Sequence, residues 1–314
     1  MPLIYYYNKI IYYSTIKKIS LNNKFFKQIN MIYFPYNNIN KVMDLKDTVE
    51  KLKTEYTDNH FTKFLKNKSV IIVGPDTNLK GKGLGSKIDS YDVVIRHNTV
   101  WEYLPFKPGF AKDYGTKTSV LYFAPQCFKD YAKKSETIKK LKLLNAKHGL
   151  RFICYQNGNK DGGYFLGPHY FLTEVDWFKK YCRQVGIKTH YSHHTTRDLV
   201  NLMVNKNNGE NTIPRTGFIS VFDMYVHLPK SVKIIGMSFY HGGGHAFRKK
   251  CMEVLDPKLN AYGKTSGTHN SEIEIEIFKE LSKVYPDLID CDIVKNDNKQ
   301  PKKPSEDDLS VDYD

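Results

Sequence analysis

The chain has 314 residues, of which 40% are hydrophobic, 26% are charged and 14% are aromatic, a composition that excludes collagen, a coiled coil and wholesale disorder. Because the mean hydropathy is −0.52 and no run of about eighteen apolar residues occurs, we expect no transmembrane segment. The net charge is +15, but only six of the 48 basic residues are arginines, on which proteins that read nucleic acids depend. The same charge is compatible with attraction for anionic sugars or nucleotides, and a basic nucleic-acid-binding protein is the less favoured alternative.

Residues 1–42 contain six lysines and no acidic residue, and their aromatic runs are interrupted by lysine and asparagine. A secretory signal needs an unbroken apolar stretch, so we predict a basic aromatic extension and no anchor, with peripheral membrane contact or organelle targeting as the alternative. Residues 43–294 are predicted to form one folded domain. Residues 295–314, with four lysines, six acidic residues and two prolines, are predicted to be a disordered tail.

The folded part alternates between helix and strand patterns. The apolar spacing over 43–66 predicts one or two amphipathic helices, and the β-branched run 70–73, closed by Gly74, predicts a buried parallel strand. Further strands are predicted at 92–96, 118–123, 150–155, 232–236 and 288–293, and further helices at 127–147, 172–186, 195–206, 216–228 and 269–284. This order predicts a single Rossmann-like α/β domain, with a mostly parallel sheet and helices on both faces.

Two segments lie where ligands bind in such sheets, beyond the carboxyl ends of strands. The first follows the strand at 70–73 and contains Gly74, Asp76, Thr77 and Asn78. The glycine-rich segment 79–85 after it fits neither a P-loop nor a dinucleotide fingerprint, but its backbone N–H groups suit a nucleotide. A plain turn, with Asp76 as a turn residue only, is the alternative.

The second segment is Pro214-Arg215-Thr216-Gly217, which precedes an apolar helix. Free N–H groups and the positive end of the helix dipole make such a helix start an anion site, although many are ordinary helix caps.

Together these segments carry a resemblance. SVIIVGPDTNLKGKGLGSKIDSYDVVIRHN at 69–98, with DYGTKT at 113–118, resembles the large motif of the eukaryotic-type sialyltransferases, glycosyltransferase family 29. PRTGFISVFDMYVHLPKSVKIIGMSFY at 214–240 resembles their small motif, and the segment from His269 to Glu274 is similar to their very small motif. The three motifs occur in the family's order, and the similarity extends over 69–294.

The resemblance implies a glycosyltransferase that moves sialic acid from CMP-sialic acid to a hydroxyl of a glycan or glycoconjugate, with inversion. It implies no metal and no cofactor besides the donor, which is a substrate. A CMP-Kdo-dependent transferase and a non-catalytic nucleotide- or glycan-binding relative are the alternatives. By matching motif positions, the resemblance implies that Asn78, Asn98, Thr216 and Gly217 contact the nucleotide. The predicted nucleotide-binding set also includes the turn residues Gly74, Asp76 and Thr77, and Arg215, whose charge suits the donor's phosphate or carboxylate.

The resemblance also implies the catalytic residues. His245 is the best match to the family's base and His241 the second, while His269 matches the histidine that contacts the donor phosphate and Glu274 supports it. Each of these residues also has a non-catalytic interpretation. His241 and His245 would lie in a mobile loop, His269 would only begin a helix, and Glu274 would be a solvated charge on a helix face.

This sequence departs from the family pattern at several positions. Val70 and Pro229 stand where the family has linked cysteines, and Pro75 and Arg215 replace its usual Asn and Ser. The five cysteines contain no C-x-x-C pair, which predicts free thiols in a reducing compartment and a soluble, cytoplasmic protein. A membrane-associated or secretory-pathway location is the alternative.

A metal site is not predicted. His190, His193 and His194 are close in sequence, but no acidic residue or cysteine completes them at a suitable spacing, so we expect a surface loop there.

Overall fold

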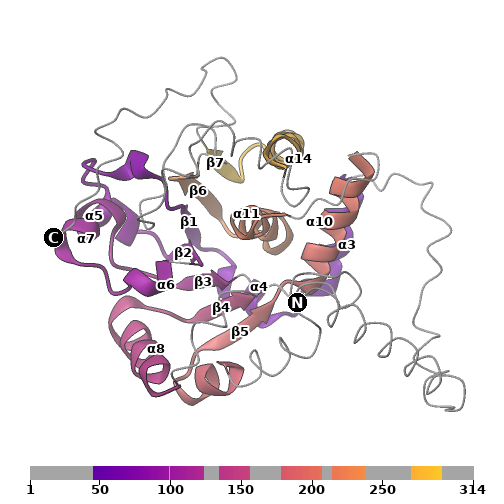
Figure 1. Ribbon diagram of the computed structural model, residues 1–314. Coiled ribbons are helices and arrows are strands. Elements are labelled where there is room, and N and C mark those ends of the chain that lie inside the picture. The colour runs from indigo at the N-terminus through magenta and orange to yellow at the C-terminus, as the bar shows by residue number, and fades with distance from the viewer. Residues whose placement is uncertain are drawn as a thin grey trace, which may run out of the picture. The chain divides into compact units, whose positions relative to one another are not determined.

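The computed structural model describes residues 45–98, 100–123, 134–155, 178–206, 214–237 and 270–291. Their strands form one seven-stranded sheet in the order β5-β4-β3-β2-β1-β6-β7, and every neighbouring pair is parallel (Figure 1). The strands are β1 (Ser69–Val73), β2 (Val93–His97), β3 (Val120–Phe123), β4 (Phe152–Tyr155), β5 (Lys188–Tyr191), β6 (Ser231–Ile235) and β7 (Ile289–Cys291). All six predicted strands and the Rossmann-like parallel sheet are confirmed.

The strand that the sequence did not reveal is β5, which has the sequence KTHY. It lies at one edge of the sheet and pairs with β4 alone. An edge strand needs no continuous apolar run, because part of it faces solvent, and so β5 lacks the β-branched signature that identified the others.

Helices cover both faces of the sheet, as predicted (Figure 1). Successive strand residues point to opposite faces, so Val70 and Ile72 enter one core while Ile71 and Val73 enter the other. The first core is covered by α3 (Leu45–Tyr56), α4 (His60–Leu65), α10 (His193–Lys206), α11 (Thr216–His227) and α14 (Ser271–Val284). The second is covered by α5 (Gly85–Asp89), α6 (Val100–Tyr103), α7 (Pro108–Tyr114), α8 (Lys134–His148) and the helical residues 178–184.

The helices predicted from periodicity are confirmed where the structure describes them. The short helices α5, α6 and α7 were not predicted, because four to seven residues are too few to display a helical repeat.

Helix α11 is the most deeply buried helix of the first face. Eleven of its twelve residues are buried, and it packs against α3, α4, α10, α14 and the sheet. An apolar sequence on all sides of a helix is expected when neighbours surround it. The start of α11 is therefore held firmly relative to the strand ends.

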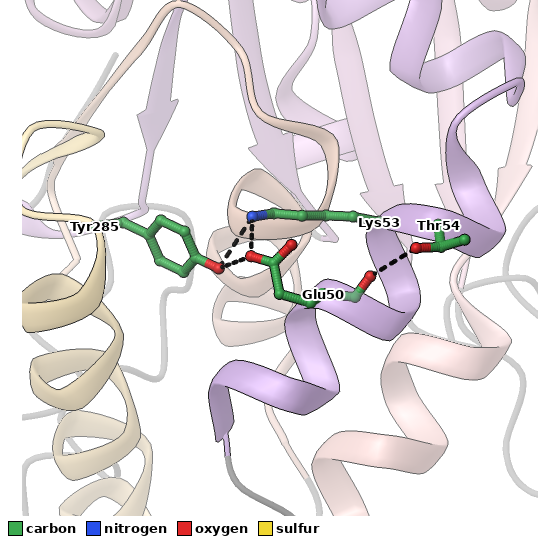
Figure 2. A network of polar contacts seen from close by, with 4 residues as sticks. All are labelled: Glu50, Lys53, Thr54 and Tyr285. Atoms are coloured by element: carbon green, nitrogen blue, oxygen red, sulfur yellow. Dashed lines mark hydrogen bonds and ion pairs between the residues drawn. The ribbon is translucent and has the colours of Figure 1, made fainter.

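A polar network holds α3 beside the end of α14 (Figure 2). The Lys53 ammonium donates to Glu50 Oε1 at 2.6 Å and to the Tyr285 hydroxyl at 3.0 Å. The Tyr285 hydroxyl donates to the same Glu50 oxygen at 2.6 Å. This network adds a polar contact to the apolar packing that joins the first and last described helices.

The described cysteines, Cys154, Cys182 and Cys291, are buried free thiols, as predicted. Cys127 and Cys251 lie outside the described residues, as do the predicted extension at 1–42 and the tail at 295–314. Among the helices that the structure describes, none has the length and hydrophobicity needed to cross a bilayer.

Candidate functional site

The sheet has a topological switch point between β1 and β6. From β1 the chain adds β2 to β5 on one side and later places β6 and β7 on the other. The strand ends are joined beyond the sheet, because Gly74 N–H donates to Ile235 O at 2.9 Å and Asp76 N–H donates to Gly236 O at 3.0 Å. Open α/β sheets bind ligands at such a point, on the carboxyl edge.

The structure brings the two predicted nucleotide-binding segments together at this edge. A Cβ added at Gly74 would lie 2.0 Å from Gly236 O and 2.4 Å from Met237 Cγ. A Cβ at Gly217 would lie 2.8 Å from Met237 Cε. Met237 therefore lies against both the turn after β1 and the first turn of α11, and glycine at 74 permits an approach that no other residue allows.

The turn after β1 is built around Asp76. Its carboxylate caps the 3₁₀ helix η2 (Thr77–Leu79) by accepting from Asn78 N–H at 3.0 Å, and its carbonyl accepts from the Tyr114 hydroxyl at 2.8 Å. Asp76 and Thr77 are buried, while the Asn78 side chain is exposed. Asp76 thus has the capping role of a turn residue, and it presents Asn78 at the surface of the edge.

The glycine-rich segment after this turn does not offer all of its N–H groups to a ligand. Gly81 N–H and Gly83 N–H donate to the two carboxylate oxygens of Asp113, each at 2.8 Å. These two N–H groups are therefore not available to a nucleotide, which corrects the expectation for this part of the segment. Asp113, a residue that sequence reasoning missed, holds the segment in place.

Arg96 and Asp89 hold the segment 113–118 in a similar way. The buried Arg96 guanidinium donates to Tyr114 O at 2.6 Å and to Thr118 Oγ1 at 3.1 Å, and burial lowers its pKa to about 10. The Asp89 carboxylate accepts from the backbone N–H groups of residues 116 and 117. The signal for Arg96 was a charged residue within an apolar strand, which calls for buried acceptors.

His97 connects the end of β2 to the start of α11. The Ser220 hydroxyl donates to Gly217 O at 2.7 Å, so its single proton is used there. His97 Nε2 lies 2.7 Å from Ser220 Oγ and must be the donor in that pair. Burial and the neighbouring Arg96 charge lower the pKa of His97 to about 3, so it is neutral. The next residue, Asn98, is half-buried at the same edge and has a positive φ of 43°.

At the start of α11, Arg215 is the N-cap residue and makes no side-chain capping hydrogen bond. Its guanidinium and its backbone N–H instead donate to the two carboxylate oxygens of Glu274, each at 2.8 Å. Glu274 is fully buried, so its alternative assignment as a solvated helix-face charge is wrong. Burial raises the pKa of Glu274 and outweighs the opposing effect of Arg215. The pair joins the first turns of α11 and α14.

The three histidines predicted to be catalytic, His241, His245 and His269, lie outside the described residues. His190 is described, and the surface loop expected around it is wrong. It lies in β5 and is only 4% exposed, because its ring faces the core under α4 and α11. The positions of His193 and His194 are in α10.

A hollow of about 450 Å³ lies elsewhere, beside the amino ends of β4 and β5. It is lined by His60, Lys63, Phe64, Arg151, Phe152, Gly186 and Lys188. Because ligands of parallel sheets bind at the carboxyl edge, this hollow is not the candidate site.

Comparisons with known proteins identify the family. Residues 14–284 match the family described as glycosyltransferase family 29 (sialyltransferase). A stretch of 56 residues is 48% identical to the CMP-N-acetylneuraminate-beta-1,4-galactoside alpha-2,3-sialyltransferase of Rattus norvegicus, covering 18% of this chain and 14% of the relative. A stretch of 62 residues is 44% identical to the Homo sapiens protein of the same name, covering 20% and 15%. The chain thus matches only about a seventh of the length of these relatives.

The solved structures that this chain matches include a mammalian sialyltransferase in complex with Gal-beta-1-3GalNAc-ortho-nitrophenol. It has a TM-score of 0.44 and 16% identity, over 83% of this chain and 80% of that one. Another is the monofunctional alpha-2,3-sialyltransferase Cst-I from Campylobacter jejuni, with a TM-score of 0.45 and 17% identity over 78% and 82%. Because the family match covers most of the sequence, the chain belongs to glycosyltransferase family 29, the sialyltransferases.

Proposed function

We propose that the chain transfers sialic acid from CMP-sialic acid to a glycan hydroxyl, with inversion and without a metal ion at the donor. The observation that supports this proposal best is the meeting of two segments at the β1–β6 switch point. The turn at Gly74 and the start of α11 at Gly217 both contact Met237, at the edge where parallel sheets bind nucleotides.

The donor phosphate belongs at the start of α11. Phosphate binds well at helix N-termini, where N–H groups and the helix dipole favour negative charge. Thr216 and Gly217 occupy this turn, and the Arg215 guanidinium lies beside it with its charge balanced by Glu274. We assign the nucleotide to the space bordered by this turn, Asn78 and Asn98.

The chemistry requires a leaving phosphate and a proton acceptor. The acceptor oxygen bonds to the anomeric carbon while the bond from that carbon to the phosphate oxygen breaks, through an oxocarbenium-like transition state. We assign removal of the acceptor proton to His245, with His241 as the second choice, and stabilisation of the phosphate to His269 and the α11 N–H groups. A metal ion is not required when such donors balance the charge that develops on the leaving group.

The test is a donor screen on the full chain, with released CMP as the readout. We expect CMP to raise the melting temperature, because a ligand that binds only the folded state stabilises it. We expect release from CMP-Neu5Ac that depends on a glycan acceptor and persists in EDTA.

Each other outcome identifies an alternative. Release from CMP-Kdo alone would reassign the donor, and CMP binding without any release would indicate a non-catalytic relative. Loss of activity in EDTA that Mg²⁺ or Mn²⁺ restores would contradict the metal-independent mechanism. The absence of a thermal shift at millimolar CMP, with salt-sensitive binding to nucleic acid, would reject the proposal.

A further inference from the structure

Three buried polar side chains meet in the first core, away from the proposed donor site. They are His190 on β5 and Asp223 and His227 on α11, and we call them the His–Asp–His cluster. None is more than 4% exposed. Asp223 and His227 are four residues apart and so share one face of the helix. One potential ligand atom from each residue lies within 4.8 Å of the others.

Hydrogen bonding fixes the tautomer of His227. The Thr62 hydroxyl donates its proton to Tyr56 O at 2.8 Å and lies 2.7 Å from His227 Nδ1. Since a hydroxyl has one proton, His227 Nδ1–H must be the donor to Thr62. His227 Nε2 therefore carries a lone pair, and this buried atom has no hydrogen-bond partner among the described residues. An imidazole held in this way by its other nitrogen is typical of a metal ligand.

Asp223 presents a second unsatisfied acceptor. Its Oδ2 accepts from the Tyr122 hydroxyl at 2.8 Å and from the Ser192 hydroxyl at 3.0 Å. Its Oδ1 is buried and makes no hydrogen bond of good geometry with a described residue, although the Thr195 hydroxyl lies close enough to the carboxylate to lower its pKa. No cationic side chain in the described part of the chain pairs with Asp223. The carboxylate is oriented on one side and unsatisfied on the other.

His190 completes the cluster. Its buried Nε2 has no hydrogen-bond partner among the described residues. Its ring stacks on Phe61 with centroids 4.5 Å apart, and it lies 5.1 Å from the His227 ring at an interplanar angle of 79°. Tyr56 packs edge-on against both imidazoles. These aromatic rings separate the cluster from solvent and restrict the orientations of the imidazoles.

Buried polar atoms are normally satisfied, and several unsatisfied atoms that converge call for an occupant. We propose that His190, Asp223 and His227 bind a divalent transition-metal ion, Zn²⁺ by preference, which joins β5 to α11. Two imidazole nitrogens and one carboxylate oxygen are a common ligand set for zinc, with a fourth position left for one water. Ligand atoms around tetrahedral zinc lie roughly 3.4 Å apart, so the ligand atoms need to approach one another by at most about 1.4 Å.

The site is structural and separate from donor chemistry. Asp223 follows Gly217 by six residues, which places it roughly 9 Å further along the helix axis, because each residue adds about 1.5 Å. An ion there cannot contact a donor bound at the first turn of α11. The inference therefore stands or falls independently of the proposed transferase activity.

The test measures bound metal in the full chain, purified without a polyhistidine tag. We expect about one Zn²⁺ per chain by mass spectrometry of the metal content. After removal of metal by a chelator under mildly denaturing conditions and refolding, added Co²⁺ should give the visible absorption of tetrahedral cobalt. Added Zn²⁺ should raise the melting temperature by roughly 5–10 °C.

Two variants and a control identify the ligands. His227→Asn keeps an N–H donor near Thr62 but removes Nε2, and Asp223→Asn removes the charge, so both should lose metal binding and the response to Zn²⁺. His60→Asn removes an exposed histidine and should bind metal like the wild type. If the variants do not fold, the wild-type stoichiometry, cobalt spectrum and thermal response still decide the question. A wild-type chain without metal that responds to no divalent ion overturns the proposal, as does equal metal content in His227→Asn.

Discussion

His97 should make the stability of the fold sensitive to acid. Its pKa of about 3 lies below the ordinary value of 6.5, so between these pH values the unfolded chain binds a proton that the folded chain cannot. The stabilisation is complete above pH 6.5 and is lost progressively as the pH falls towards 3. Each pH unit in this window costs up to about 1.4 kcal/mol.

The variant His97→Gln retains a donor for Ser220 and removes this titration. Between pH 7 and pH 5, wild-type protein should lose about 2 kcal/mol more of its unfolding free energy than the variant, as measured by urea denaturation. His60→Gln serves as the exposed control. Parallel pH profiles for the wild type and His97→Gln would mean that the pKa of His97 is the same in the folded and unfolded chains, which would contradict this account.

His245 is the second residue whose removal is informative. The variant His245→Ala should lower kcat by roughly 100-fold or more, because it removes the proposed general base. The affinity for CMP should stay near the wild-type value, since a base acts mainly in the transition state. His269→Ala should lower kcat and also weaken donor binding, because the proposed partner of His269 is the donor phosphate. Normal turnover in His245→Ala, with loss in His241→Ala, would move the assignment to His241.

At the scale of residues, the sequence identified the segments at the sheet edge but not the residues that hold them in place. Asn78, Asn98 and Gly217 were placed by motif, and the structure locates them around one strand edge. The supporting roles of Asp113, Arg96 and His97 were not predicted, because their partners are backbone groups or distant side chains. A carboxylate that accepts from two glycine N–H groups leaves no sequence pattern of its own.

Gly74, where the segments after β1 and β6 approach most closely, should not be replaceable by a residue with a side chain. In Gly74→Ala, the added methyl group would meet Gly236 O at 2.0 Å, and backbone cannot move aside as a flexible side chain can. We expect a loss of about 1–3 kcal/mol in unfolding free energy and weaker binding of CMP.

Gly109→Ala is the matched control, because no atom lies within 4 Å of its added Cβ and the residue lies in α7. This variant should gain about 0.5–1 kcal/mol through helix propensity. The measurement is chemical denaturation with and without CMP. Equal stability of Gly74→Ala and wild type would mean that the two strand ends are further apart than described.

At the scale of elements, strands with β-branched runs were predicted and the polar edge strand was not. β5 also carries His190, so missing the strand concealed the His–Asp–His cluster. Its other members, Asp223 and His227, are an acidic residue and a histidine at helical spacing within a largely apolar helix, which is the signal that could have revealed them. Sequence proximity instead grouped His190 with His193 and His194, which belong to a different element.

For the whole molecule, we predict that stability does not depend on disulfides. The cysteines of the described residues are free and buried, and Val70 and Pro229 occupy the positions of the linked cysteines implied by the family resemblance. A reducing agent that binds Zn²⁺ only weakly, such as a trialkylphosphine, should leave the melting temperature unchanged. If a disulfide bridge is present elsewhere in the chain, its reduction should lower the melting temperature, because removal of a native disulfide typically costs about 2–5 kcal/mol of unfolding free energy.

The position of β1 in the centre of the sheet has a consequence for folding during synthesis. Val70 pairs with Val93 on one side and with Val232 on the other, so one flank closes over a short loop and the other only after most of the chain has been made. Contacts between residues far apart in sequence form late, because a long loop must close first. A nascent chain that has released β1 to β5 from the ribosome therefore exposes the β6 side of β1, with an unpaired backbone edge and one half of the proposed donor site. Until β6 arrives, this edge is open to pairing with other chains, and no nucleotide can yet bind there to protect it.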